Sequence, residues 1–150
     1  MLDVYVDADA CPVKDEVVRV ARRHDLRVVL VSNSWMRTPE AGRIELVVVG
    51  QGLDEADDWI ATHVAAGDIV ITSDIPLAAR CLAAGARVLG PKGDAFSRET
   101  IGHALARREI LARLREDGAI TGGPAPMQPR DRSAFLGRLE EIVQAVRRGA

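Results

Sequence analysis

Apolar and polar positions along the chain follow two kinds of pattern. Short runs rich in valine, isoleucine and leucine, several of them uninterrupted, are typical of parallel strands covered on both faces. Longer segments carry their apolar residues on one face at helical spacing. The patterns predict strands at about 2–7, 27–32, 44–49, 69–73 and 87–89, and helices at about 12–24, 54–66, 76–84, 97–116 and 132–148.

The alternation of these strands and helices predicts an α/β fold with three layers, a mostly parallel sheet and right-handed crossovers. Residues 33–43 and the glycine- and proline-containing segment 121–131 are expected to be loops. Asp131 is well placed to cap the last helix, which we expect to pack outside the three-layer unit. The whole chain, 1–150, is expected to form one domain.

Composition is that of an ordinary soluble globular protein, with 47% hydrophobic and 28% charged residues. The chain has no apolar run of about 18 residues that would predict a membrane span. Its N-terminus lacks the basic and apolar regions of a signal peptide, and its two cysteines do not form a secreted disulfide framework. We therefore expect a cytoplasmic protein with no membrane association.

Two predicted strands end in acidic residues. Asp7 ends the first strand, Asp9 comes two residues later, and Asp74 follows the strand at 69–73. In open α/β sheets, ligands bind outside the carboxyl ends of the strands, so neighbouring strands would bring these acids together. Carboxylate oxygens are the ligands that Mg²⁺ and Mn²⁺ prefer. The alternative is that Asp7 is a solvated strand end, that Asp9 only caps the helix that follows it, and that Ser73 or Asp74 only caps the helix at 76–84.

Asp57 is an acid on the apolar face of a predicted helix. At helical spacing it falls among Leu53, Ala56, Ile60 and Val64. A carboxylate facing a core is costly unless it is paired, hydrogen-bonded or bound to a cation. Asp57 could complete a Mg²⁺ or Mn²⁺ shell, or it could accept N–H groups of the helix's first turn.

Several further residues are candidates for binding a substrate phosphate. The chain up to residue 97 has 10 basic and 15 acidic side chains, whereas residues 98–150 have 10 basic and 7 acidic, so the C-terminal part could offer phosphates a basic surface. Lys92, which lies between two glycines, could equally belong to a solvated turn. Arg130 and Arg132 could equally belong to an ordinary linker to the last helix. The candidates are Asn33, Ser73, Lys92, Arg130 and Arg132.

The ordered motifs of the chain resemble the uncharacterised bacterial YaiI/YqxD family over almost the whole length. Residues 127 and 128, Met-Gln, depart from the aromatic-serine pair expected there. The resemblance implies a PIN-like, Rossmann-like nuclease fold. Acids from the first strand, a middle helix and a later strand would then hold Mg²⁺ or Mn²⁺, at positions matching Asp7, Asp9, Asp57 and Asp74. The motifs span residues 6–14, 32–33, 56–60, 68–78, 90–93, 121–124 and 131–132.

These observations favour a metal-dependent nuclease that hydrolyses phosphodiesters, with RNA as the favoured nucleic acid. One alternative is a phosphatase of the haloacid-dehalogenase type, with Asp7 as nucleophile, Asp9 as acid/base, Ser73 as phosphate ligand and Lys92 as charge stabiliser. That scheme also needs a late strand ending in an acidic pair, and none follows Lys92. The other alternative is a non-catalytic module that binds RNA or protein.

Overall fold

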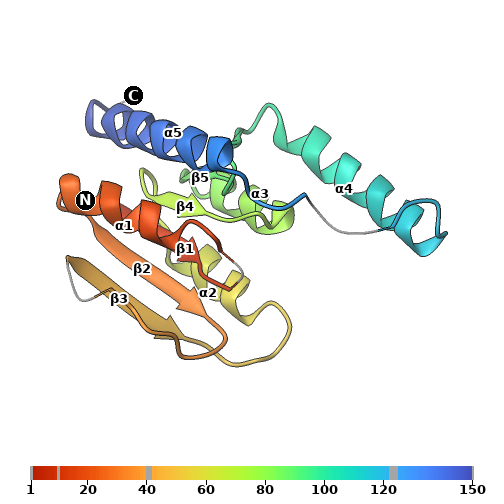
Figure 1. Ribbon diagram of the computed structural model, residues 1–150, viewed down its shortest axis with the longest axis horizontal. Coiled ribbons are helices and arrows are strands. Elements are labelled where there is room, and N and C mark those ends of the chain that lie inside the picture. The colour runs from red at the N-terminus through yellow and green to blue at the C-terminus, as the bar shows by residue number, and fades with distance from the viewer. Residues whose placement is uncertain (1, 10, 40–41, 122–124, 150) are drawn as a thin grey trace.

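Strands and helices alternate along the chain in the predicted order (Figure 1). The computed structural model describes residues 2–9, 11–39, 42–121 and 125–149. The strands are β1 (Asp3–Asp7), β2 (Arg27–Ser32), β3 (Arg43–Val48), β4 (Ile69–Ile71), β5 (Arg87–Leu89) and β6 (Ala95–Phe96). The helices are α1 (Lys14–Arg23), α2 (Glu55–His63), α3 (Ile75–Ala83), α4 (Ile101–Glu116) and α5 (Pro129–Arg147).

The six strands form one mostly parallel sheet in the order β3-β2-β1-β4-β5-β6. The chain builds outward from β1 through β2 to β3, then returns to place β4 on the other side of β1. This reversal creates a crevice at the carboxyl ends of β1 and β4, where doubly wound sheets bind ligands. The sequence did not predict β6, a two-residue strand antiparallel to β5, because it is too short to show a period.

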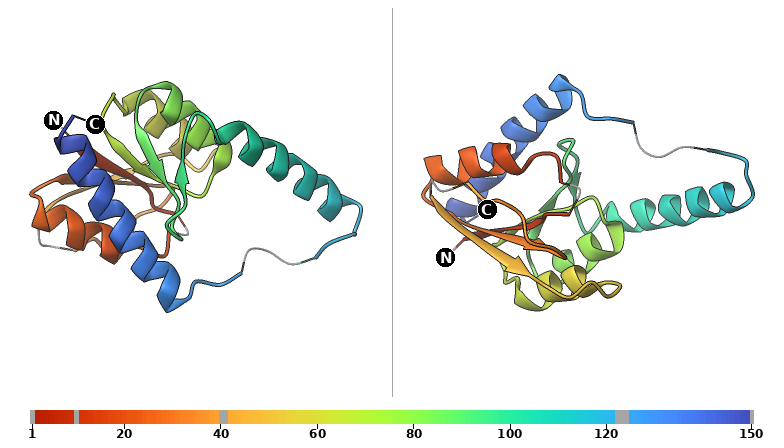
Figure 2. Two further views of the ribbon diagram at one scale, coloured as in Figure 1. Left: turned by 90° about the horizontal axis from the view of Figure 1, so that it is seen from above. Right: turned by 60° about the horizontal axis from the view of Figure 1, so that its bottom comes forward.

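Helices cover both faces of the sheet, so the three-layer prediction is confirmed. Helices α1 and α5 lie over one face, and α2 and α3 over the other (Figure 2). Side chains of β1 alternate between the two resulting cores, with Val4 and Val6 on the α1/α5 side and Tyr5 on the α2/α3 side. Strands buried on both faces explain why the sequence shows continuous apolar runs.

The C-terminal helix differs from its prediction in two respects. It does not pack outside the layers, because Phe135 and Leu139 are buried in the core shared with α1. It also begins at Pro129, since proline is favoured in the first turn of a helix. Asp131 is therefore inside the helix rather than its N-cap, and it accepts the N–H of the N-cap residue Gln128 at 2.9 Å.

Helix α4 is the element least involved in the core. It begins at Ile101, four residues later than predicted, because residues 97–100 form a hydrogen-bonded turn. None of its side chains is buried, and the helix projects from the body (Figure 2). Among the helices described, none is both long and apolar enough to cross a membrane.

Candidate functional site

An acidic cleft lies at the carboxyl ends of β1 and β4, where the sheet topology creates the crevice. It encloses about 320 Å³. The four predicted acids and Asn33 all line it, although they come from distant parts of the chain. The lining residues are Asp7, Asp9, Asn33, Gly52, Leu53, Asp54, Glu55, Ala56, Asp57 and Asp74.

Asp7 ends β1 and is held by a hydroxyl from the neighbouring strand. Its Oδ2 accepts a hydrogen bond from Thr72 Oγ1 at 2.9 Å, just beyond the end of β4. Burial raises the pKa of Asp7 above its ordinary value, and the negative charges of Asp74 and Asp9 raise it further. The protein thus favours the protonated form of Asp7 more than water does.

Asp9 is fixed by the end of β2 and not by the helix that follows it. Its Oδ1 accepts from Ser32 Oγ and its Oδ2 from the Asn33 N–H, both at 2.8 Å. The side-chain amide of Asn33 donates a hydrogen bond to the Gly50 carbonyl at 2.8 Å. The N-cap of α1 is Val13, which has no side-chain cap, so Asp9 does not take the helix-capping role considered above.

Asp74 has a structural contact as well as a place in the cleft. It is the N-cap of α3, and its Oδ1 accepts the Leu77 N–H at 2.9 Å. Its own N–H donates to Thr72 Oγ1 at 3.0 Å. The Thr72 hydroxyl thus bonds to the Asp7 carboxylate and to the Asp74 backbone N–H. Strand β4 ends at Ile71, two residues earlier than the sequence predicted. Asp74 therefore caps α3 and lines the cleft at the same time.

Asp57 carries the largest electrostatic perturbation of the four acids. It lies in the first turn of α2 and is half-buried. Burial raises its pKa to about 6, and the charges of Asp74, Asp7 and Asp54 and a hydrogen bond with Asp74 act in the same direction. Asp57 therefore holds its proton more tightly than an isolated aspartate does.

The charge of the cleft is not balanced by the protein itself. Six carboxylates line it, and among the described residues no lysine, arginine or histidine does. In the same described ranges, no three histidine, cysteine, aspartate or glutamate side chains are arranged to hold a metal ion. The donor chemistry suits a hard cation held by one or two carboxylates together with water or phosphate oxygens.

The other predicted binding residues lie outside the cleft lining. Lys92 donates to the Ala125 carbonyl at 2.7 Å, and Arg132 pairs with Glu16 of α1 at 3.1 Å. Arg130 is exposed at the start of α5, and Ser73 is exposed beside Asp74.

Two hydroxyls that hold the acids, those of Ser32 and Thr72, were missed by sequence reasoning. Both are polar residues directly after apolar runs, and that position is the feature that could have indicated them.

Comparison with known proteins shows the family of this chain. It belongs to the YaiI/YqxD family, described as uncharacterised, whose model matches residues 5–145. UPF0178 proteins of Rhodopseudomonas palustris strain HaA2 and Rhodospirillum centenum are 54% and 55% identical to it, covering 97% and 99% of this chain and 88% and 99% of theirs. A UPF0178 protein of Nitrobacter winogradskyi is 52% identical over 97% of this chain and 92% of its own. No solved structure matches.

Proposed function

We propose that the protein is a divalent-metal-dependent nuclease that hydrolyses phosphodiester bonds, with RNA as its substrate. The observation that carries the proposal is the convergence of Asp7, Asp9, Asp57 and Asp74 on one cleft at the topological switch point. A cluster of carboxylates without basic partners is costly for the folded protein, and a bound cation offsets that cost. The family resemblance to PIN-like nucleases points to the same chemistry.

Mg²⁺ or Mn²⁺ fits the donor set, and Asp7, Asp9, Asp57 and Asp74 would hold it. When bound, the cation would neutralise local charge and supply an activated water for attack on phosphorus. Asp9, locked by Ser32 and Asn33, would keep its orientation without reorganising when substrate binds. Asp57, with a pKa of about 6 in the metal-free protein, is poised to accept or return a proton near neutral pH.

The proposal is tested with a labelled single-stranded RNA and the purified protein. We expect Mn²⁺-stimulated cleavage that is lost on Asp9→Asn. The matched control is Asp58→Asn, because Asp58 is exposed, lies beside Asp57 and pairs with Arg80 at 2.7 Å outside the cleft. Cleavage that persists in Asp9→Asn, or no cleavage with any divalent cation, would contradict the proposal.

The same assay separates the two alternatives. A phosphatase would release inorganic phosphate from small monoesters and form a trappable aspartyl-phosphate at Asp7. In the structure, Lys92 contacts the Ala125 carbonyl and not the cleft, so the charge stabiliser of that scheme is displaced from the acids. A binding module would retain RNA affinity in Asp9→Asn and cleave neither substrate.

A further inference from the structure

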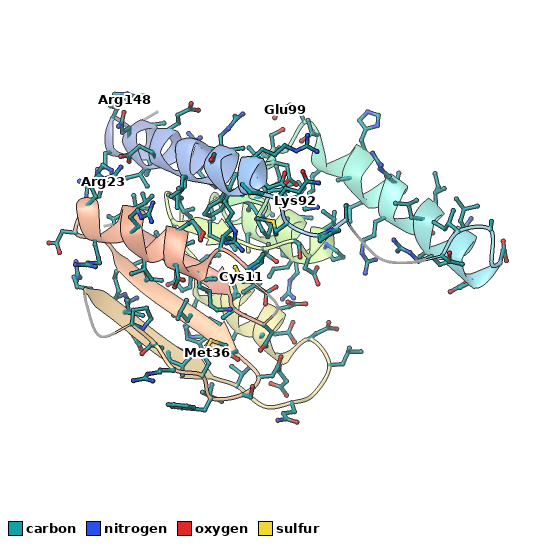
Figure 3. All side chains as sticks on the ribbon, viewed as in Figure 1. Cys11, Arg23, Met36, Lys92, Glu99 and Arg148 are labelled. Carbon is teal, nitrogen blue, oxygen red and sulfur yellow. The ribbon has the colours of Figure 1, made fainter. Side chains whose placement is uncertain are left out.

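Helix α4 forms, with residues 117–121, an arm that leaves the body of the molecule. The helix is about 24 Å long at the usual rise per residue, and none of its side chains is buried. Figures 1 and 2 show it extending on the side to which the carboxyl ends of β1 and β2 point. In Figure 3 the side chains of its outer turns stand clear of the rest of the ribbon, whereas Ile101 at its start packs against the α2/α3 core.

Three arginines are gathered on one side of the arm. Arg107, Arg108 and Arg115 fall within an arc of about 100° around the helix axis, and we call this surface the arginine face. All three are exposed, and within the described ranges their side chains have neither a hydrogen bond nor an ion pair. Glu109 lies outside the arc and pairs instead with Arg113 at 3.1 Å.

Among the described residues of the arm, only two large apolar side chains are exposed, Leu105 and Ile110, at 37% and 58% of their full exposure. They are separated by about 140° around the axis, so these two do not share a face. Ile110, Leu111 and Leu114 do share one, within about 100°, but Leu111 and Leu114 are only partly exposed, and Leu111 lies between arginines of the arginine face. The arginines are the exposed large side chains of the arginine face, so its complementary partner is a polyanion.

We propose that the arginine face binds the phosphate backbone of single-stranded RNA and holds the strand whose reacting phosphate enters the acidic cleft. This inference rests on the proposed function, because it names the substrate contact of the same site. A cleft lined by six carboxylates repels a polyanion, and the net charge of −2 supplies no general attraction. Arginines with no partner among the described residues are free to form bidentate contacts with phosphate oxygens.

The test measures binding of a fluorescein-labelled oligo(U) to the full chain by anisotropy, with a chelator present so that no cleavage occurs. The variant changes Arg107→Gln, Arg108→Gln and Arg115→Gln together. We expect affinity at low salt to fall about tenfold or more, and the slope of log affinity against log salt to decrease by about 2, as three lost phosphate contacts on a single strand predict. The triple lysine variant should keep most of the affinity.

The matched control changes Arg23→Gln, Arg113→Gln and Arg138→Gln, three exposed arginines that already pair with carboxylates. It removes the same charge and should leave affinity and salt slope within about twofold. Equal losses in both triple variants, or no loss in the arm variant, would overturn the inference. So would a dimer in sedimentation that the arm variant dissociates without weakening RNA binding, since the arm would then be a contact between two copies.

Catalysis does not enter these measurements, so the two proposals fail separately. If RNA binding depends on the arginine face but no RNA is cleaved, the proposed nuclease activity is wrong and the proposed RNA contact stands. If RNA is cleaved but the arm variant binds it with unchanged affinity, the proposed RNA contact is wrong and the nuclease activity stands.

Discussion

At the scale of single residues, the cleft depends on hydroxyls as much as on acids. Thr72 is almost fully buried, donates to Asp7 and accepts the Asp74 N–H. It thereby satisfies two polar groups from two strand ends with one side chain. A buried polar group that loses its partner costs more free energy than the bond contributed, because its desolvation is no longer compensated.

Replacing Thr72 should therefore be costly although the change is small. We expect Thr72→Val to lower the free energy of unfolding by about 1–3 kcal/mol, since the Asp74 N–H loses its acceptor and Asp7 its donor. Thr72→Ser keeps the hydroxyl and should recover most of the loss. Urea denaturation of both variants measures the difference. Equal stability of the valine and serine variants would contradict the dual hydrogen-bonding role.

Replacing Asp57 should stabilise the metal-free protein, in contrast to replacing Thr72, because the charge of Asp57 is unfavourable in the folded state. Its raised pKa, about 6, means that the folded protein holds a proton which the unfolded chain has already released. The associated stability is present below about pH 4 and is lost as the pH rises through about 6. In metal-free protein near neutral pH, Asp57→Asn should then raise the free energy of unfolding by about 1 kcal/mol, after allowance for solvent screening.

The measurement for Asp57 is chemical denaturation with a chelator across this pH range. The unmodified protein should lose stability between about pH 4 and about pH 6, and Asp57→Asn should make this loss smaller. Asp58→Asn is the control, because Asp58 is exposed and paired with Arg80, so its loss should not stabilise the protein. Destabilisation by Asp57→Asn near neutral pH would contradict the repulsion argument.

At the scale of elements, the two C-terminal helices have opposite roles. Helix α5 supplies Phe135 and Leu139 to the core beside α1, and Arg132 near its start bonds to Glu16 and to the Pro12 carbonyl. Helix α4 is also amply apolar in composition but supplies nothing buried. It contacts the body at its first turn, where Ile101 packs against the α2/α3 core. A helix with so little tertiary packing is marginal in water, so we expect low local stability in α4.

This contrast predicts different costs for truncating apolar side chains. Phe135→Ala should lower the free energy of unfolding by about 3–5 kcal/mol, because it leaves a cavity in a fully packed core. Ile110→Ala on α4 should change it by no more than about 0.5 kcal/mol. Thermal and urea unfolding measure both. A large loss from Ile110→Ala would show that α4 packs on something in solution.

At the scale of the whole molecule, charge is distributed between two regions of opposite sign. The cleft at the strand ends is acidic, and the arm that projects on the same side has the arginine face. Carboxylates must be deprotonated to bind a cation, so metal binding and the pH dependence of stability are linked. Because a ligand that binds only the folded state stabilises it, this linkage can be read from the melting temperature.

Mn²⁺ should therefore raise the melting temperature more at about pH 7.5 than at about pH 5, where Asp57 keeps its proton. Asp7→Asn and Asp74→Asn should each abolish most of the rise, whereas Asp58→Asn should retain it. Differential scanning fluorimetry at the two pH values checks these expectations. An equal rise in all three variants would mean that the cation binds elsewhere.

Local pattern alone determined the order of the main strands and helices and the positions of the acids at strand ends. Continuous apolar runs such as 27–32 need no distant information, because burial on both faces of a parallel sheet requires every position to be apolar. Asp57 was similarly visible as an acid among apolar positions of one helix face. These features are periodic over a few residues, which is the range that a sequence displays directly.

Only the tertiary structure decided which of these features meet. Asp7 and Thr72 are 65 positions apart, and their hydrogen bond exists because β1 and β4 are neighbours at the reversal of strand order. The pKa of Asp57, the burial of α5 and the exposure of α4 likewise depend on neighbours distant in sequence. Burial and charge interactions are sums over everything nearby in space, and a local pattern contains only the neighbours along the chain.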